Sequence, residues 1–302
     1  MLGLTKPRTP TRALCGIDVG TLESVRSVGG WDMGVLVSPD KRQATVQFDL
    51  PDTDRLDEQT WRSWEQAIAG IPQIVATFTV DTLGDNTPAA RAGAVFRAVG
   101  SDETKNYDTF LADIATGVAP LFDAADALFP TTSRPLSPAE LCEHLTTGLG
   151  VAPALTWSGV MAAEAEETDK TVTIAGTEWS VFQTPPDAET LIGELDELTA
   201  DWEGTDWLRR TRVFRPLIVA DADDDSTLAG EGRRHQLITV LGGTAAAGAV
   251  IDYLSSPAAI ALRRSWQRQK VLAIAGLGTG LLGFQRPMDH LHRPTTLPHV
   301  RF

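Results

Sequence analysis

The sequence predicts an α+β protein of two βαβ-type halves, each with a mixed sheet that is covered by helices. Stretches in which apolar and polar residues alternate, which is typical of strands, recur along the chain between stretches with apolar residues at helical spacing. The 302 residues are enough for one large or two small domains. We therefore expect a flexible basic arm at 1–15, halves at 16–150 and 151–285, and a tail at 286–302.

The N-terminal half is expected to contain strands and helices in turn. Residues 34–50 predict a hairpin, because Ala44, Val46 and Phe48 alternate with polar residues after a Pro39–Asp40 turn. Further along, the patterns predict a Trp-bearing helix after Asp57, a strand over 74–82, a helix at 88–98, a helix over 107–122, and a helix behind the capping box that begins at Ser137.

The C-terminal half follows a joint at 148–158. Its patterns predict a hairpin at 171–182, a helix after Thr184, a strand at 211–219, a strand at 235–241 and a helix at 244–254.

The last predicted element is a long basic helix from Pro257 to Ala275. Ser256 is a suitable N-cap, Pro257 suits the first helical position, and Gly276 is a natural stop. Trp266 lies on the apolar stripe of this helix, and the basic residues fall on its other sides. We predict these basic residues to bind a partner: Arg263, Arg264, Arg268 and Lys270.

Charge is unevenly distributed along the chain. The net charge is −14, yet residues 262–302 contain seven basic residues and one acidic residue, so the remainder carries −20. An acidic body makes nucleic acid an unlikely partner. The two cysteines, Cys15 and Cys142, are far apart and indicate free thiols in a reducing compartment. Without an apolar run of eighteen residues, we expect no transmembrane segment and a cytoplasmic protein, or one peripheral at the inner face of the membrane.

Two glycine-rich stretches leave a nucleotide-binding alternative open. Gly278–Gly283 matches G-x-G-x-x-G, but no helix or second strand follows to complete the βαβ unit that dinucleotide binding needs. Gly16–Thr21 resembles the first phosphate loop of actin-like ATPases, but no second loop of that family appears. The alternating acids that begin at Asp221 lack the glycine and the final glutamate of a calcium loop. We therefore predict no catalytic constellation, no cofactor and no metal.

Several pieces, in their order and spacing, resemble the amino-terminal module of conjugative, type IV secretion ATPases, and most closely their actinobacterial putative conjugal-transfer relatives. The likeness covers roughly residues 30–285. The pieces are IVATFTVDT after the Trp-bearing helix, LSPAEL between two helices, the TVTIAGTEWSVFQTPP hairpin, the strand TRVFRPL, and the closing RRSWQRQKVLAIAGLGTGLL.

In the motor-bearing members of that family a P-loop ATPase follows, whereas this chain contains no P-loop motif. The resemblance implies an assembly module without its motor. We expect a non-enzymatic component of a conjugation or type IV/VII secretion-like apparatus that docks an ATPase or a membrane subunit and that is able to oligomerise. The alternative is an enzyme that holds a nucleotide or cofactor through Gly16–Thr21 or Gly278–Gly283.

Overall fold

One antiparallel sheet runs through the whole of the described structure. The computed structural model describes residues 14–39, 41–50, 58–71, 73–83, 89–97, 107–129, 134–183, 208–216, 232–242, 263–264 and 268–280. The main path of the sheet is β1-β2-β3-β5-β4-β10-β11-β9-β8-β7, with β6 paired to β3 and β12 paired to β9. Neighbouring strands in this described part are antiparallel in every pair.

The strands differ widely in length. The first half supplies β1 (Thr21–Arg26), β2 (Asp32–Val37), β3 (Gln43–Leu50), β4 (Ile74–Leu83), β5 (Ala89–Arg97) and the short β6 (Arg134–Pro135). The second half supplies β7 (Ala165–Glu167), β8 (Val172–Ile174), β9 (Thr177–Gln183), β10 (Leu208–Pro216), β11 (Gly232–Leu241) and the short β12 (Arg263–Arg264).

The strand order repeats on the two sides of the seam between β4 and β10. Read from its outer edge inward, the first half runs β1-β2-β3-β5-β4 and the second runs β7-β8-β9-β11-β10. A two-residue strand then pairs with the third strand of each half, β6 with β3 and β12 with β9, and a helix follows each of them. The two halves are therefore built on the same topology, and their innermost strands join them into one sheet.

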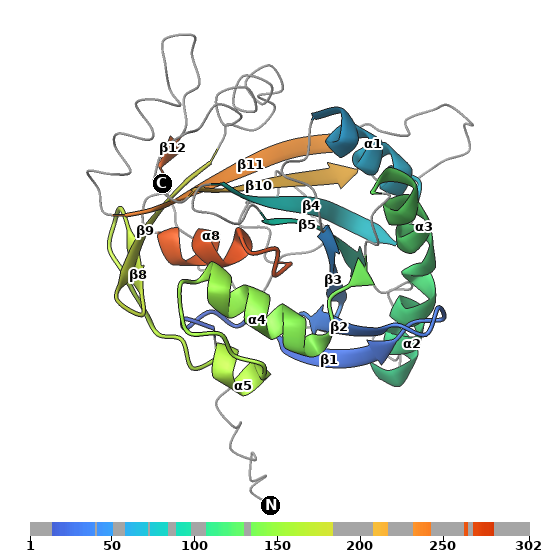
Figure 1. The fold of residues 1–302 in the computed structure, drawn as a ribbon, viewed down its shortest axis with the longest axis horizontal. Helices are drawn as coiled ribbons and strands as arrows, with labels where there is room; N and C mark the ends of the chain where they lie inside the picture. The colour runs from blue at the N-terminus through green and yellow to red at the C-terminus, as the bar shows by residue number, and fades with distance from the viewer. Residues whose placement is uncertain are drawn as a thin grey trace, which may run out of the picture.

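The described helices lie in two groups. The first contains α1 (Glu58–Ala69), α2 (Tyr107–Gly117) and α3 (Ala119–Leu128), and the second contains α4 (Pro138–Gly148), the short α5 (Trp157–Val160) and α8 (Gln269–Ala275). Figure 1 shows α1, α3 and α2 in a column along one side, and α4 and α8 side by side in front of the sheet. The first group shares a core with strands of the first half, and the second with β8, β9 and β11.

Most predicted elements of the described part are confirmed. Trp61, Trp64 and Ile68 of α1 are buried as their spacing predicts. The capping box at the start of α4 is complete, since the Ser137 hydroxyl accepts from Glu140 N while the Glu140 carboxylate accepts from Ser137 N. The predicted hairpins at 34–50 and 171–182 are β2–β3 and β8–β9, and the predicted strands appear as β4, β10 and β11.

The predicted mixture of helices and strands is confirmed. The strands form one antiparallel sheet, however, and not the two mixed sheets that were predicted. In the first half β3 and β4 are both antiparallel to β5, which lies between them, so β3 and β4 run in the same direction. Helix α1 connects them, which makes β3–α1–β4 a split βαβ unit. The βαβ pattern in the sequence is therefore present, but an antiparallel strand is inserted at its centre.

Three local predictions are wrong. The segment expected as a helix at 88–98 is strand β5, whose buried Ala90, Ala92, Ala94 and Phe96 follow the two-residue period of a strand. Pairing with β3 and β4 overrides the helix propensity of alanine here. The single helix expected over 107–122 is divided into α2 and α3 around Val118, because Pro120 starts a new helix.

The third wrong prediction is the long helix from Pro257 to Ala275. Arg263 and Arg264 form β12, and helix α8 begins only at Gln269. Ser256 and Pro257 are local signals, whereas the pairing of β12 with β9 joins segments about eighty residues apart and leaves no local pattern. Residues 257–262 and 265–267, the helices expected after Thr184 and at 244–254, the arm at 1–13 and the tail at 286–302 lie outside the described residues.

Candidate functional site

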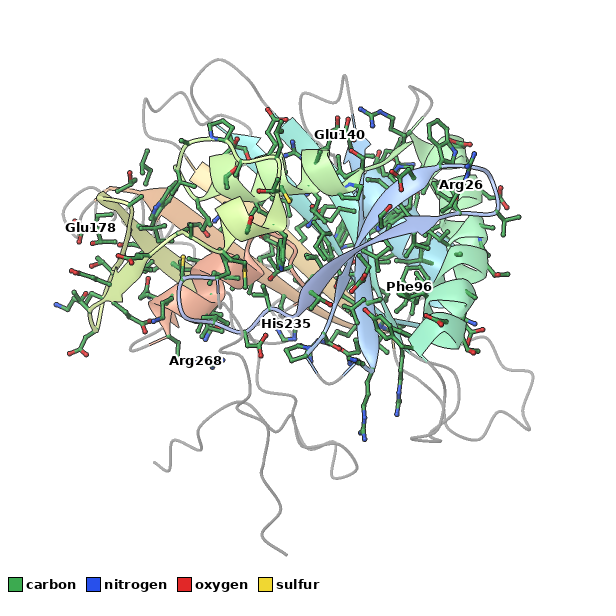
Figure 2. The ribbon with its side chains drawn as sticks, turned by 90° about the horizontal axis from the view of Figure 1, so that it is seen from below. Arg26, Phe96, Glu140, Glu178, His235 and Arg268 are labelled. Atoms are coloured by element: carbon green, nitrogen blue, oxygen red, sulfur yellow. The ribbon has the colours of Figure 1, made fainter. Side chains whose placement is uncertain are left out.

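The four residues predicted to bind a partner lie around the start of α8. Arg263 and Arg264 pair with Gln183 and Phe182 of β9. Arg268 is the N-cap residue of α8 and Lys270 lies in its first turn, and both are half-buried. Burial lowers the pKa of Arg268. Figure 2 shows Arg268 at the same end of the molecule as Glu178, with Arg26 at the opposite end.

A carboxylate from the sheet caps this helix. The Glu167 Oε1 atom of β7 accepts a hydrogen bond of 2.8 Å from the main-chain N–H of Lys270. A negative charge at a helix N-terminus is favourable because it meets unsatisfied N–H groups and the positive end of the helix dipole. The first turn of α8 contains no acidic residue of its own.

The glycine-rich turn after α8 is filled by side chains of this chain. Gln47 Nε2 donates to Leu277 O at 3.1 Å and to Gly278 O at 3.0 Å, and the Thr211 hydroxyl donates to Gly276 O at 2.7 Å. Gly278 has a φ of +72°, and a Cβ atom there would overlap the ring of Phe78. A phosphate loop needs main-chain N–H groups that reach a ligand, whereas residues 276–279 are buried in the protein core.

This finding argues against the nucleotide interpretation of Gly278–Gly283 in its described part, 278–280. The remainder of the motif, 281–283, lies outside the described residues.

The other glycine-rich stretch, Gly16–Thr21, is a turn that leads into β1. Asp18 Oδ1 accepts a hydrogen bond of 3.0 Å from Gly20 N, so the carboxylate that would lie near a metal-bound phosphate closes its own turn. Gly20, with a φ of +90°, lies so close to Val37 that a Cβ atom would overlap the Val37 carbonyl. The close approach to β2 explains this glycine without a ligand.

A hollow of about 980 Å³ lies beside this turn and strand β7. It is lined by Cys15, Gly16, Met161, Ala162, Ala163, Glu164, Ala165, Glu166, Thr173, Ala175, Gly176 and Lys270. Most of these side chains are small, Lys270 supplies a positive charge, and Glu164 and Glu166 supply two negative charges. The hollow therefore brings one of the predicted basic residues next to acids that the sequence analysis did not single out.

The thiol in this hollow is not prepared for nucleophilic chemistry. Burial raises the pKa of Cys15 to about 11, although Lys270 acts in the opposite direction. At neutral pH this thiol is protonated, whereas the thiolate is the reactive form. Cys142 is also free and buried, and burial raises its pKa to about 11.

A buried arginine joins the two halves above the sheet. Arg209 of β10 donates from Nη1 to Gly148 O at 2.8 Å and from Nη2 to Ala273 O at 3.2 Å, so it contacts the ends of α4 and α8. A cation at the C-terminal end of a helix is favourable, and here one guanidinium serves two helices. Burial lowers the pKa of Arg209 to about 9, which leaves it charged at neutral pH.

The imidazole of His144 lies in this region too. Burial, followed by the charges of Arg91 and Arg209, holds the pKa of His144 well below its usual value. The side chain of His144 is buried inside α4, which is the environment of a structural histidine.

In the part of the chain that the structure describes, no group of three or more histidine, cysteine or carboxylate side chains lies close enough to hold a metal ion. The acidic loop at Asp221 lies outside that part. Among the helices of the same part, none has both the length and the apolar character needed to cross a bilayer.

The sequence contains a local signal for strand β7 but none for the hollow itself. Residues 164–167 read Glu-Ala-Glu-Glu directly before a predicted hairpin, and alternating acids are a period-two pattern. No family model matches the chain, and no curated protein matches it.

Proposed function

We propose that this chain is a non-enzymatic component of a conjugation or type IV/VII secretion-like apparatus and that it docks an ATPase or a membrane subunit. The resemblance of its segments to the amino-terminal module of conjugative ATPases suggests this role. The observation that carries the proposal is the turn at 276–280, because the chain's own Gln47, Thr211 and Phe78 occupy the space around its strongest nucleotide-like motif.

The repeat of the fold supports a docking role for the basic residues at the start of α8. In the first half, Arg134 of β6 is paired with Glu140 of the following helix, with Arg134 Nη1 and Glu140 Oε2 2.8 Å apart. In the second half β12 contributes two arginines, and the helix that follows has no acid in its first turn. The equivalent position therefore carries more positive charge, and the carboxylate that caps the following helix comes from Glu167 of β7 and not from the helix itself. We infer that the added positive charge suits an acidic surface on a partner.

A charge-reversal experiment tests the proposal. The variant carries Arg263→Glu, Arg264→Glu, Arg268→Glu and Lys270→Glu, and the control carries Arg26→Glu and Arg97→Glu. Both are titrated against a purified P-loop ATPase of the conjugative type, and ATP is titrated against the wild-type chain by calorimetry. We expect the quadruple variant to lose at least tenfold in affinity while the control binds normally, because the control reversals lie elsewhere on the molecule.

Glutamates at 268 and 270 meet the positive end of the α8 dipole but also lie near the Glu167 carboxylate, so thermal unfolding is used to confirm that the quadruple variant is folded. Equal binding by both variants would refute the docking role of the basic residues. Micromolar binding of ATP to the chain alone would instead favour the enzyme alternative.

A further inference from the structure

Strand β7 forms one end of the sheet. In the described part of the chain it pairs with β8 and with no other strand. A free strand edge presents a row of main-chain donors and acceptors to which another extended segment can be added. The sequence offers β7 neither a proline nor a lysine, which are common protections of such edges.

The register shows which main-chain groups point away from the sheet. Thr168 N donates to Thr171 O at 2.9 Å, and Ala175 N donates to Glu164 O at 3.4 Å, so even-numbered residues of β7 bond toward β8. Because this direction alternates along an antiparallel strand, Ala165 and Glu167 direct their N–H and C=O groups outward.

The same outward row already accepts one bond from another part of the chain. Ala163, two residues before Ala165, accepts a hydrogen bond of 3.2 Å from the main-chain N–H of Cys15. The edge is therefore able to receive main-chain partners, and its next outward position, Ala165, lines the hollow beside β7.

The walls of the hollow favour a polypeptide over a drug-like ligand. Its volume is about 980 Å³, and Met161 is its one large apolar lining residue; none of the described lining residues is aromatic. Small-molecule sites are mostly lined by apolar and aromatic side chains. Glycine and alanine walls instead let another main chain approach closely.

The charge around the edge is acidic. The exposed residues Glu164, Glu166 and Glu167 lie on or next to β7, and the hairpin beyond them adds the oppositely charged Asp169 and Lys170, so the three glutamates set the sign of the charge. The ammonium group of Lys270 lies at the Gly16 side of the same hollow and offsets part of this negative charge. An extended segment that carries basic side chains complements this edge.

We propose that β7 is a docking strand for an extended basic segment of a partner protein, which is added antiparallel or parallel to β7 through the outward groups of Ala165 and Glu167. This inference goes beyond the proposed function, because it concerns the main-chain edge of β7 and its glutamates; of the basic docking residues, Lys270 also lines the hollow beside β7. The chain's own basic N-terminal residues and a second copy of the chain are alternative occupants.

The probe is a fluorescein-labelled peptide of ten residues in which lysine and threonine alternate, measured by fluorescence anisotropy against the full chain. A glutamate–threonine peptide and a lysine–threonine peptide with N-methyl groups on alternate residues are its controls. The protein variants are Ala165→Pro, which removes an outward N–H that an edge strand can lack, and Glu164→Gln with Glu166→Gln. The matched charge control is Asp123→Asn with Glu143→Gln.

We expect saturable binding of the lysine–threonine peptide that weakens at least tenfold in both β7 variants and with the N-methylated peptide, while the charge control binds as the wild type does. Thermal unfolding confirms that each variant is folded, and the N-methylated peptide tests the strand geometry without any change to the protein. Absent binding, or binding that is equal in all variants, would overturn the proposal.

Two further outcomes would assign the edge to another occupant and also overturn the proposal. In the first outcome, the lysine–threonine peptide binds only after Lys6, Arg8 and Arg12 are replaced by glutamine. This result would mean that the chain's own N-terminal residues compete with the peptide for the hollow. The other is a dimer, seen by sedimentation, that Ala165→Pro dissociates.

Discussion

Replacement of Gln47 by methionine tests whether side chains of the first half hold the turn at 276–280. Gln47 is fully buried, and its Nε2 donates to the carbonyl groups of Leu277 and Gly278, which are 230 and 231 residues away in sequence. Methionine has a similar volume, so the substitution removes hydrogen bonds without opening a large cavity. A buried acceptor without its donor costs about 1–3 kcal/mol.

The expected loss of unfolding free energy is smaller than the loss from two buried carbonyl groups without hydrogen-bond donors. His144 also bonds to the main chain of Leu277, so Gly278 O is the acceptor that loses most. Gln47 Oε1 is itself buried without a hydrogen-bond partner, and its removal returns part of the loss. We expect Gln47→Met to lower the free energy of unfolding by about 1–3 kcal/mol.

Chemical denaturation followed by tryptophan fluorescence measures this loss, with Gln43→Met at the partly exposed start of β3 as the control. The sharper measurement is a double-mutant cycle with Thr211→Val, which removes the bond to Gly276 O. If the turn is held as a unit, the double variant loses less than the sum of the two single losses. Strictly additive losses, or no loss from Gln47→Met, would refute this reasoning.

Three further predictions concern individual residues. Gly278→Ala is expected to lower the free energy of unfolding by about 2–5 kcal/mol, because the new Cβ atom overlaps the Phe78 ring and the backbone has a left-handed φ. The control is Gly176→Ala, which has a φ of +85° but open space around it and should lower the free energy of thermal unfolding by about 1–2 kcal/mol. Glu140→Gln keeps the capping box but removes the charge. The Arg134 hydrogen bond lowers the pKa of Glu140 to about 2, so the wild type gains stability above pH 4.5 and loses it from there toward pH 2. The variant should lack this acid-dependent difference, which solvent screening keeps to about 1 kcal/mol or less; equal pH profiles would contradict it. His144→Gln should reduce the loss of stability between pH 7 and 5.5 by about 1 kcal/mol, because the histidine binds a proton in the unfolded chain but not when it is buried in the fold. Unfolding curves at the two pH values measure this difference. An unchanged pH dependence would show that His144 is protonated in the fold.

Local signals predicted the elements whose pattern is complete within the element. The Trp61–Trp64–Ile68 stripe, the Ser137–Glu140 capping box and the alternating residues of β3 each carry their structure within about ten residues. Elements whose conformation depends on a distant partner were missed. Strand β5 was assigned to a helix because its alanines favour helices until β3 and β4 pair with it.

The candidate site was predictable only in part, for the same reason. The basic residues near α8 were recognised from composition, but their division between a strand and a helix depends on β9. The hollow beside β7 unites Cys15, Glu166 and Lys270, which are separated by more than a hundred residues, so no local pattern announces it. Arg209 reads as an ordinary strand residue, and its contacts with two helix ends appear only in the folded chain.

The hydrogen bonds from Gln47 to Leu277 and Gly278 have a consequence for folding during synthesis on the ribosome. The strand that carries Gln47 leaves the exit tunnel more than two hundred residues before the segment that fills the space above it. During synthesis, which proceeds at roughly 5–20 residues per second, the first half holds a buried glutamine and the Phe78 ring next to an unfilled position for ten seconds or more. The first half therefore emerges as a sheet with an open seam at β4 and an incomplete interior. Strand β10 then closes the seam, and residues 269–280, the last that the structure describes, complete the interior of the first half.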